Sequence, residues 1–379
     1  MMNKKIQGLT IILFCGFLGG FSIFNLFTEQ RSFSDAENRV LAQFPEFSWK
    51  RFFFDNYTAD MEEWFTDQFI GRDTWIGVKA ASERALGKIE NQNVYFGHED
   101  WLIGQVDIQD LTQSQKNIAK INAFAEQSEI PVSLMLVPTA AEIEKDKLPG
   151  GAYNTDQNVL LDSLEDQLTS VQIIDVRAAL IQQKQRLNSE ETLYFKTDHH
   201  WTALGAEAGY EALMSAWGQT ALQLGQDFTY QLAAEGFKGT QYSRSGAFWH
   251  RGDPVWTWSY TEPLTVQVVY DQTQTDTSLF SLKRLAEKDK YMVYLDGNHA
   301  LAEIETSSSS NEKLLVIKDS YAHVLIPYLA PHFRSITMAD LRYYRLPMSE
   351  LARQMGADRI LLVYSVDNFC TDTNLSLLK

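Results

Sequence analysis

The chain has 379 residues, with 33 Lys and Arg against 49 Asp and Glu, a formal net charge of −16. This charge excludes nucleic acid and anionic lipid as main partners, because both are polyanions that bind cationic surfaces. The length allows one large domain with a full hydrophobic core and a smaller additional element. Its two cysteines, Cys15 and Cys370, stand near opposite ends of the chain and are not expected to pair.

The first segment predicts a membrane anchor. Ile6–Phe27 is 22 residues long without a charge and follows Lys4 and Lys5. That length spans a bilayer core of about 30 Å, and the lysines favour a cytoplasmic N-terminus. A cleaved signal peptide is the alternative, but its apolar region is usually only about 7–15 residues. We expect residues 1–28 to form a cytoplasmic tip and a signal anchor, with a single-pass chain in the cell membrane and its remainder outside the cytoplasm.

Residues 29–110 are rich in aromatic side chains at helical spacing and predict a juxtamembrane helical region. An aromatic platform for glycan is the alternative interpretation. From residue 111 onward, short apolar runs alternate with amphipathic patterns, which favours an α/β fold with a doubly wound, mostly parallel sheet over 111–379. The expected strands are Val132–Val137, Val171–Val176, Lys313–Ile317, Ile336–Met338 and Arg359–Tyr364.

A stretch at about 221–291 interrupts this alternation with glycines and tryptophans. We interpret it as a loop and β insertion beside the main sheet. Trp249, Trp256 and Trp258 would pack there or stack on sugar rings.

Two short motifs carry the parts of an acyl-transfer site. The first is Thr197-Asp-His-His-Trp-Thr202, which places a carboxylate beside two imidazoles. The second, about 120 residues later, is Lys318-Asp-Ser320 at the end of an apolar run, with an apparent helix over Tyr321–Leu329 behind it. A carboxylate, an imidazole and a strand-end hydroxyl are the components of a Ser-His-Asp triad, which is recognised by geometry rather than by chain order.

The Asp198-His-His-Trp201 and Lys318-Asp-Ser-Tyr321 segments resemble the DHHW family of bacterial envelope proteins, which is similar to the alginate O-acetyltransferase type of SGNH hydrolase. The resemblance implies an SGNH-hydrolase-like fold with permuted motif order. Further segments fit the same family: Ser34-Asp-Ala-Glu-Asn-Arg39, Asp67-Gln-Phe-Ile-Gly-Arg72, Phe237-Lys-Gly-Thr240, Asp296-Gly-Asn298 and Asp340-Leu-Arg-Tyr-Tyr344.

By position, the resemblance implies that Asp198 orients the base His200 and that Ser320 is the nucleophile. Lys318 stands where the related motif has glycine, and His199 is an additional imidazole. If the segment is extended, Asp198 and His200 point to one side and His199 to the other. Amides at the start of the following helix would then stabilise an oxyanion.

Four further residues are expected to contact the substrate: Trp201, Tyr321, Arg342 and Tyr343. Three alternatives compete with the triad. Asp198 and His200 would form a buried structural pair, Ser320 would cap a helix, or Asp198, His199 and His200 would bind a metal. Imidazoles on opposite faces do not readily share one ion, and no HExxH or CxxC spacing is present, so we expect neither a metal nor another cofactor.

These patterns lead to two hypotheses. The first is an extracytoplasmic, membrane-anchored O-acyltransferase or esterase that modifies cell-envelope polysaccharide and works with a multi-spanning acyl exporter. The second is a non-catalytic envelope protein of the same fold that binds glycan or an assembly partner.

Overall fold

The computed structural model describes residues 4–54 and 56–378; residues 1–3 of the expected cytoplasmic tip lie outside the described part. The chain divides into two compact units. The first contains residues 1–88 and 246–249, and the second contains 89–245 and 250–379. The second unit thus begins before residue 111, where the sequence patterns placed the start of the main domain.

The first unit begins with α1 (Lys4–Leu26). Within residues 4–54 and 56–378, no helix is long and apolar enough to cross a membrane. The membrane span expected at Ile6–Phe27 is therefore not supported by the structure. The other elements of this unit are β1 (Phe33–Ser34), β2 (Arg39–Val40), α2 (Trp49–Phe54), α3 (Tyr57–Asp67) and α4 (Arg72–Ala85).

Ion pairs join two of the sequence motifs within the first unit. Arg39 pairs with Asp67, whose Oδ2 also accepts a hydrogen bond of 2.9 Å from the Ala42 amide. Arg72 pairs with Glu37. The 34–39 and 67–72 motifs therefore fix the chain that precedes α2 against the α3–α4 corner.

The helical character expected for residues 29–110 ends with α4. Residues 90–104 form a three-stranded antiparallel sheet instead. Its first two strands are joined by Gln92 and Asn93, which both have positive φ, as a two-residue hairpin turn requires. The strands are β3 (Glu90–Asn91), β4 (Val94–Phe96) and β5 (Leu102–Gly104).

An eight-stranded sheet of order β11-β10-β12-β14-β13-β15-β6-β7 forms the centre of the second unit. The neighbours from β14 to β7 pair in parallel, and β12, β10 and β11 extend the sheet with antiparallel pairing. The mostly parallel sheet expected from the sequence is confirmed. Its strands are β6 (Val132–Val137), β7 (Gln172–Ile173), β10 (Val266–Tyr270), β11 (Gln274–Asp276), β12 (Leu301–Thr306), β13 (Lys313–Lys318), β14 (Ser335–Ala339) and β15 (Arg359–Ser365).

The 221–291 stretch is only partly an insertion beside this sheet. β8 (Phe228–Phe237) and β9 (Asp253–Tyr260) form a separate hairpin, whereas β10 and β11 belong to the main sheet. The difference arises because β10 pairs with β12, a strand that the sequence patterns did not predict.

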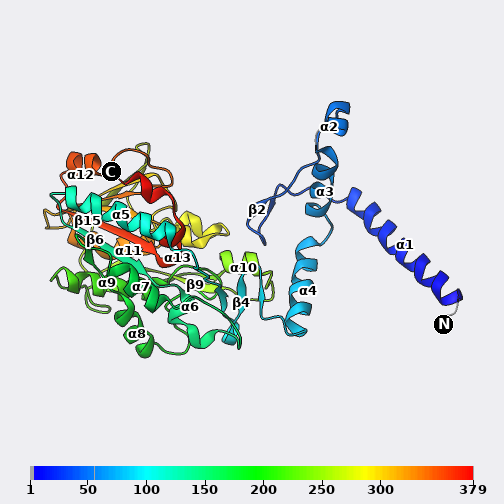
Figure 1. The fold of residues 1–379 in the computed structure, drawn as a ribbon, viewed down its shortest axis with the longest axis horizontal. Coiled ribbons are helices and arrows are strands. Elements are labelled where there is room, and N and C mark those ends of the chain that lie inside the picture. Colours follow the sequence, from blue (N-terminus) through cyan, green and yellow to red (C-terminus); the bar gives the residue numbers. More distant parts are fainter. Residues whose placement is uncertain (1–3, 55, 379) are drawn as a thin grey trace. The chain divides into compact units, whose positions relative to one another are not determined.

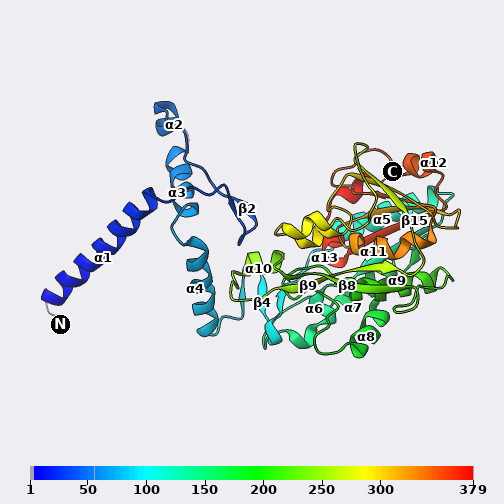
Figure 2. The same ribbon diagram turned by 180° about the vertical axis from the view of Figure 1, so that it is seen from behind.

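Helices cover both faces of the sheet (Figures 1 and 2). Alternate residues of β13 enter two separate cores: Leu314 and Val316 pack on the side of α9 and α11, and Leu315 and Ile317 on the side of α5 and α12. The helices of this unit are α5 (Thr112–Gln127), α6 (Ala140–Ile143), α7 (Gln157–Glu165), α8 (Arg177–Arg186), α9 (Ala203–Ala216), α10 (Thr240–Ser245), α11 (Ala322–Leu329), α12 (Met348–Met355) and α13 (Val366–Thr371).

Candidate active site

The site lies at the carboxyl edge of the parallel strands. β6, β13, β14 and β15 run in the same direction, so their carboxyl ends meet along one edge, which is where open α/β sheets bind ligands. The segments that follow these strands contribute Thr139, Ser320, Arg342 and Asp367, respectively, to a common cleft.

The Asp-His-His-Trp segment is a tight chain reversal rather than an extended strand. Tyr194 and Trp201 form an antiparallel bridge, and the Phe195 amide donates to the His200 carbonyl at 3.1 Å. The prediction that His199 points away from its neighbours is therefore wrong. Its Nδ1 lies 2.8 Å from the Thr240 Oγ1, and its ring centroid lies 3.8 Å from that of His200.

Three expected side chains lie in hydrogen-bond contact. Asp198 Oδ1 is 2.5 Å from His200 Nδ1, and His200 Nε2 is 2.7 Å from Ser320 Oγ. These distances match the contacts between an orienting carboxylate, a base and a nucleophile. The Ser320 hydroxyl thus contacts the imidazole, while Asp319 accepts the Tyr321 amide at 2.8 Å at the start of α11.

Asp198 is fixed by the Phe237-Lys-Gly-Thr240 motif. Its Oδ2 accepts hydrogen bonds from the Thr240 amide at 2.7 Å and the Thr240 hydroxyl at 3.0 Å. Gly239 allows this approach, because a Cβ at that position would lie 2.6 Å from the Asp198 Cγ. The carboxylate therefore keeps Oδ1 for His200 while Oδ2 holds it to the start of α10.

Tyr291 supports the other side of His200 and was missed by sequence reasoning. Its ring stacks on the imidazole with centroids 3.7 Å apart and planes 7° apart. Its hydroxyl donates to the Ser320 carbonyl at 2.8 Å. One aromatic side chain thus orients the imidazole and also holds the backbone of Ser320. It lies in a short apolar stretch without a motif that would have identified it.

Burial sets the charge state of the site. The protein interior, followed by the charge of His199, lowers the pKa of His200 to about 4. Burial opposes the ionisation of Asp198, but His199 and His200 together hold the pKa of this carboxyl well below its usual range. His200 is consequently neutral at pH 7 and has a nitrogen able to accept a proton.

A buried polar network lies under the Ser320 turn. Lys318 Nζ is 3.0 Å from Asp340 Oδ2 and 2.7 Å from His323 Nε2. Arg342 donates to both Asp340 oxygens, with its Nε at 2.8 Å and its Nη2 at 2.6 Å. Lys318, at the position where the related motif has glycine, thus orients Asp340, which in turn orients Arg342.

The start of α11 does not provide the expected free amide. The Tyr321 N–H already donates to Asp319. The Asp319 Oδ2 accepts the Ser365 amide at 2.8 Å, so this carboxylate ties the end of β13 to the end of β15. The prediction that the first helix amides face a substrate oxyanion is therefore wrong for Tyr321.

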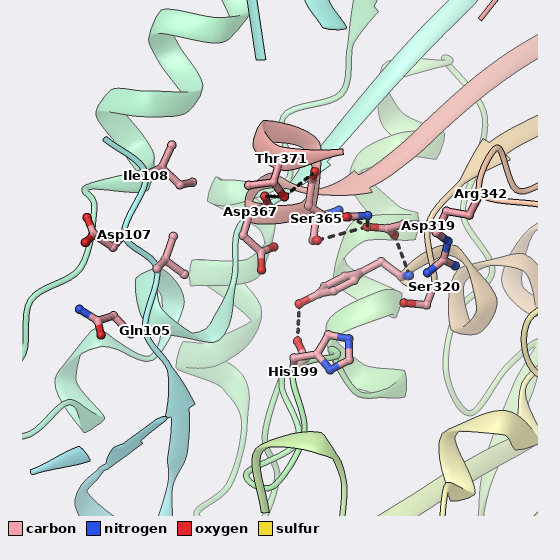
Figure 3. Close-up of a pocket in the computed structure, with 13 residues that line it drawn as sticks. Gln105, Asp107, Ile108, His199, Asp319, Ser320, Arg342, Ser365, Asp367 and Thr371 are labelled. Carbon is pink, nitrogen blue, oxygen red and sulfur yellow. Dashed lines mark hydrogen bonds between the residues drawn. The ribbon is translucent and has the colours of Figure 1, made fainter. Parts of the chain in front are cut away.

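A two-lobed cleft adjoins these groups. The first lobe has a volume of about 390 Å³ and contains Ser320, with Gln105, Asp107 and Ile108 on one side and Asp319 and Arg342 on the other (Figure 3). The second lobe, of about 330 Å³, is lined by Asp198 and by residues of α10. Five residues line both lobes: Gln105, Val106, His199, Tyr321 and Asp367.

The four expected substrate contacts divide into two pairs. Tyr321 and Arg342 line the cleft. Trp201 does not, because it is fully buried and its Nε1 donates to the Tyr321 carbonyl at 2.9 Å. Tyr343 is 54% exposed and lines neither lobe; its ring lies against the Arg342 guanidinium. Trp201 is therefore a structural residue, and the expectation of a substrate contact is wrong for it.

The chain reversal also changes the argument about metals. Ligand atoms of Asp198, His199 and His200 lie within 4.8 Å of one another, so these side chains do not point to opposite faces. Both ring nitrogens of His200 already have partners, Asp198 and Ser320. An ion held by His200 would have to displace one of them.

The family model for the SGNH hydrolase-like domain of the acetyltransferase AlgX matches residues 94–298, just over half of the chain. The chain belongs to this family. The match includes Asp198 and His200 but ends before Ser320. Among curated proteins, no significant match is found.

Solved structures give the same fold. A DHHW family protein from Eubacterium siraeum is 23% identical, with a TM-score of 0.60 over 73% of this chain and 91% of the other. Bacillus cereus PatB1 with a sulfonyl adduct is 22% identical, with a TM-score of 0.59 over 74% of this chain and 98% of the other. The resemblance to DHHW and SGNH-type acetyltransferase proteins expected from the motifs is confirmed.

Proposed function

We propose that the protein is an O-acyltransferase or esterase that modifies cell-envelope polysaccharide through Ser320, His200 and Asp198. The observation that carries this proposal is the continuous contact from Asp198 through His200 to Ser320, with 2.5 Å and 2.7 Å between the atoms. Membership of an acetyltransferase family supports acetyl as the acyl group.

In the first step, Ser320 Oγ attacks the carbonyl carbon of a donor ester and its proton passes to His200 Nε2. The donor alcohol then leaves with that proton, and Ser320 carries the acyl group. In the second step, a sugar hydroxyl or water attacks the acyl carbon and gives its proton to His200. The bond from the acyl carbon to Ser320 Oγ breaks, and the serine recovers the proton.

The tetrahedral intermediate of each step carries a negative charge on oxygen. Among the residues that line the first lobe, Arg342 is the side chain with a permanent positive charge. Its hydrogen bonds to Asp340 raise its pKa further, so it stays charged throughout. We assign Arg342 the electrostatic stabilisation of this oxyanion, for which preorganised donors are worth roughly 3–4 kcal/mol each.

A sulfonyl fluoride tests the nucleophile directly. The adduct reported for PatB1 makes this reagent class a suitable choice. Peptide mass spectrometry should place the sulfonyl group on Ser320 and not on Ser365, a second serine of the same lobe whose hydroxyl donates to Asp319. Ser320→Ala should abolish both labelling and hydrolysis of p-nitrophenyl acetate. If folded Ser320→Ala retains wild-type turnover, the non-catalytic hypothesis of glycan or partner binding replaces this proposal.

We also propose that the second unit works outside the cytoplasm, at the cell membrane, because the envelope polysaccharide is found there. A periplasmic-type reporter fused to the C-terminus should be active, and fractionation should recover the full-length chain with membranes after a high-salt wash. Full-length protein in the soluble cytosol would contradict this location. Co-purification with a multi-spanning acyl exporter would support acyl transfer over hydrolysis.

A further inference from the structure

Two buried side-chain oxygens, from residues that line the second lobe of the cleft, have no hydrogen-bond partner among the described residues. The first is the Oε1 of Gln241, a residue that is only 5% exposed. The other is the Oδ1 of Asp367. Both residues line this lobe, which has a volume of about 330 Å³.

Unpaired acceptors in such a position indicate a ligand with hydrogen-bond donors. Buried polar atoms in folded proteins are paired in the large majority of cases, because an unpaired one loses its hydration without compensation. The unpaired oxygens of Asp367 and Gln241 are a carboxyl oxygen and an amide oxygen, and both accept hydrogen bonds. A phosphate or carboxylate ligand would bring a second negative charge towards Asp367. A neutral ligand with several hydroxyl groups satisfies both oxygens.

The position of Asp367 connects this ligand to the chemistry. Asp367 lines the lobe that holds Ser320 as well as the lobe that holds Gln241. Figure 3 shows it in the middle of the cleft, between the Gln105–Ile108 side and the Ser320 side. A sugar held by these two residues therefore lies next to the place where an acyl group on Ser320 would project.

We propose that the second lobe is the acceptor subsite, where Gln241 and Asp367 each accept a hydrogen bond from hydroxyl or amide groups of a neutral sugar residue. The transfer step rests on the proposed function. A further hydroxyl of that sugar attacks the acyl carbon, the bond to Ser320 Oγ breaks, and the hydroxyl proton returns to Ser320 through His200. Gln241 and Asp367 take no proton themselves and select sugar over water.

Binding is measured first, on the full-length Ser320→Ala chain, so that the result does not depend on turnover. Cellobiose and the N-acetylglucosamine disaccharide serve as probes in ligand-observed NMR titrations. We compare Gln241→Leu and Asp367→Asn, which keep side-chain size, with Asp372→Asn, which follows the same helix but lines neither lobe. At least one disaccharide should bind, and each cleft variant should weaken its affinity by about tenfold or more, whereas Asp372→Asn should not.

Transfer is measured second, with Ser320 intact and p-nitrophenyl acetate as donor. In both cleft variants, the amount of acetylated disaccharide formed per nitrophenolate released should fall about tenfold or more below the wild-type value. Failure of both disaccharides to bind, or unchanged binding in both variants, would overturn the subsite. If the wild type releases no nitrophenolate, the proposed function is rejected. The binding result then decides the subsite independently.

Discussion

The backbone of Gly239 lies so close to the Asp198 side chain that a methyl group on residue 239 would clash with the carboxylate. A Cβ on residue 239 would lie 2.6 Å from the Asp198 Cγ, well inside van der Waals contact. The glycine therefore belongs to the geometry of the site, because it lets α10 begin directly against the carboxylate that orients His200.

Gly239→Ala should impair turnover more than folding. The extra methyl pushes Asp198 away from His200, and loss of the carboxylate's hold on the imidazole costs up to ~10⁴-fold in kcat in triad enzymes. The overpacking itself should cost about 1–3 kcal/mol of unfolding free energy. Kinetics with p-nitrophenyl acetate and urea denaturation measure both quantities. Gly150→Ala, where the new methyl meets no atom within 4 Å, is the matched control and should behave as wild type.

The acid limb of the pH profile of kcat/KM should lie at an unusually low pH. Burial and the His199 charge lower the pKa of His200 to about 4, so the base stays deprotonated and active well below pH 6.5. His199→Gln removes the charge effect and should move the acid limb to higher pH. A wild-type limb near pH 6.5, or no movement in His199→Gln, would contradict this assignment of charge.

The same group should make folding stability depend on pH. Between pH 6.5 and about 4 the unfolded chain protonates His200 while the folded chain does not, so the unfolded state binds more protons. Stability should therefore fall as the pH decreases through this window, by about 1.4 kcal/mol for each unit of pKa difference. Urea denaturation at several pH values measures the slope. The slope of unfolding free energy against pH should be shallower in His200→Gln than in wild type. Equal slopes in the two proteins would show that other groups cause the pH dependence.

Lys318→Met should destabilise the protein strongly. The substitution removes the cation that pairs with the fully buried Asp340 at 3.0 Å, and breaking a buried pair costs about 3–5 kcal/mol. Lys318→Met combined with Asp340→Asn should recover part of that loss, because the fully buried side chain at position 340 is then neutral and the partly exposed Arg342 keeps its contact with water. Urea denaturation midpoints of wild type and the two variants measure both changes in stability. A midpoint for Lys318→Met equal to that of wild type would show that the pair contributes nothing.

Local sequence patterns were sufficient to predict most strands of the main sheet and to select Asp198, His200 and Ser320, which lie in hydrogen-bond contact. Leu314–Ile317 is a continuous apolar run, as expected for a strand buried on both faces, and it ends at Asp319-Ser320. The rule that ligands bind beyond the carboxyl ends of parallel strands would also have selected Asp367, which follows β15. The sequence patterns failed for β12, which becomes a strand of the main sheet by pairing with β10 and β14.

Contacts between distant segments decided the rest of the site. His199 lies beside His200 because the chain reverses between Tyr194 and Trp201, and no residue periodicity reports such a reversal. Tyr291 reaches His200 from a segment about 90 residues later, and Gln241 and Asp367 meet in one cleft from α10 and α13. The order of residues along the chain specified which chemical groups were present and which of them stood at strand ends. Only the packing of those strands and helices determined which groups came within hydrogen-bond distance, because that distance depends on the whole sheet and not on neighbours along the chain.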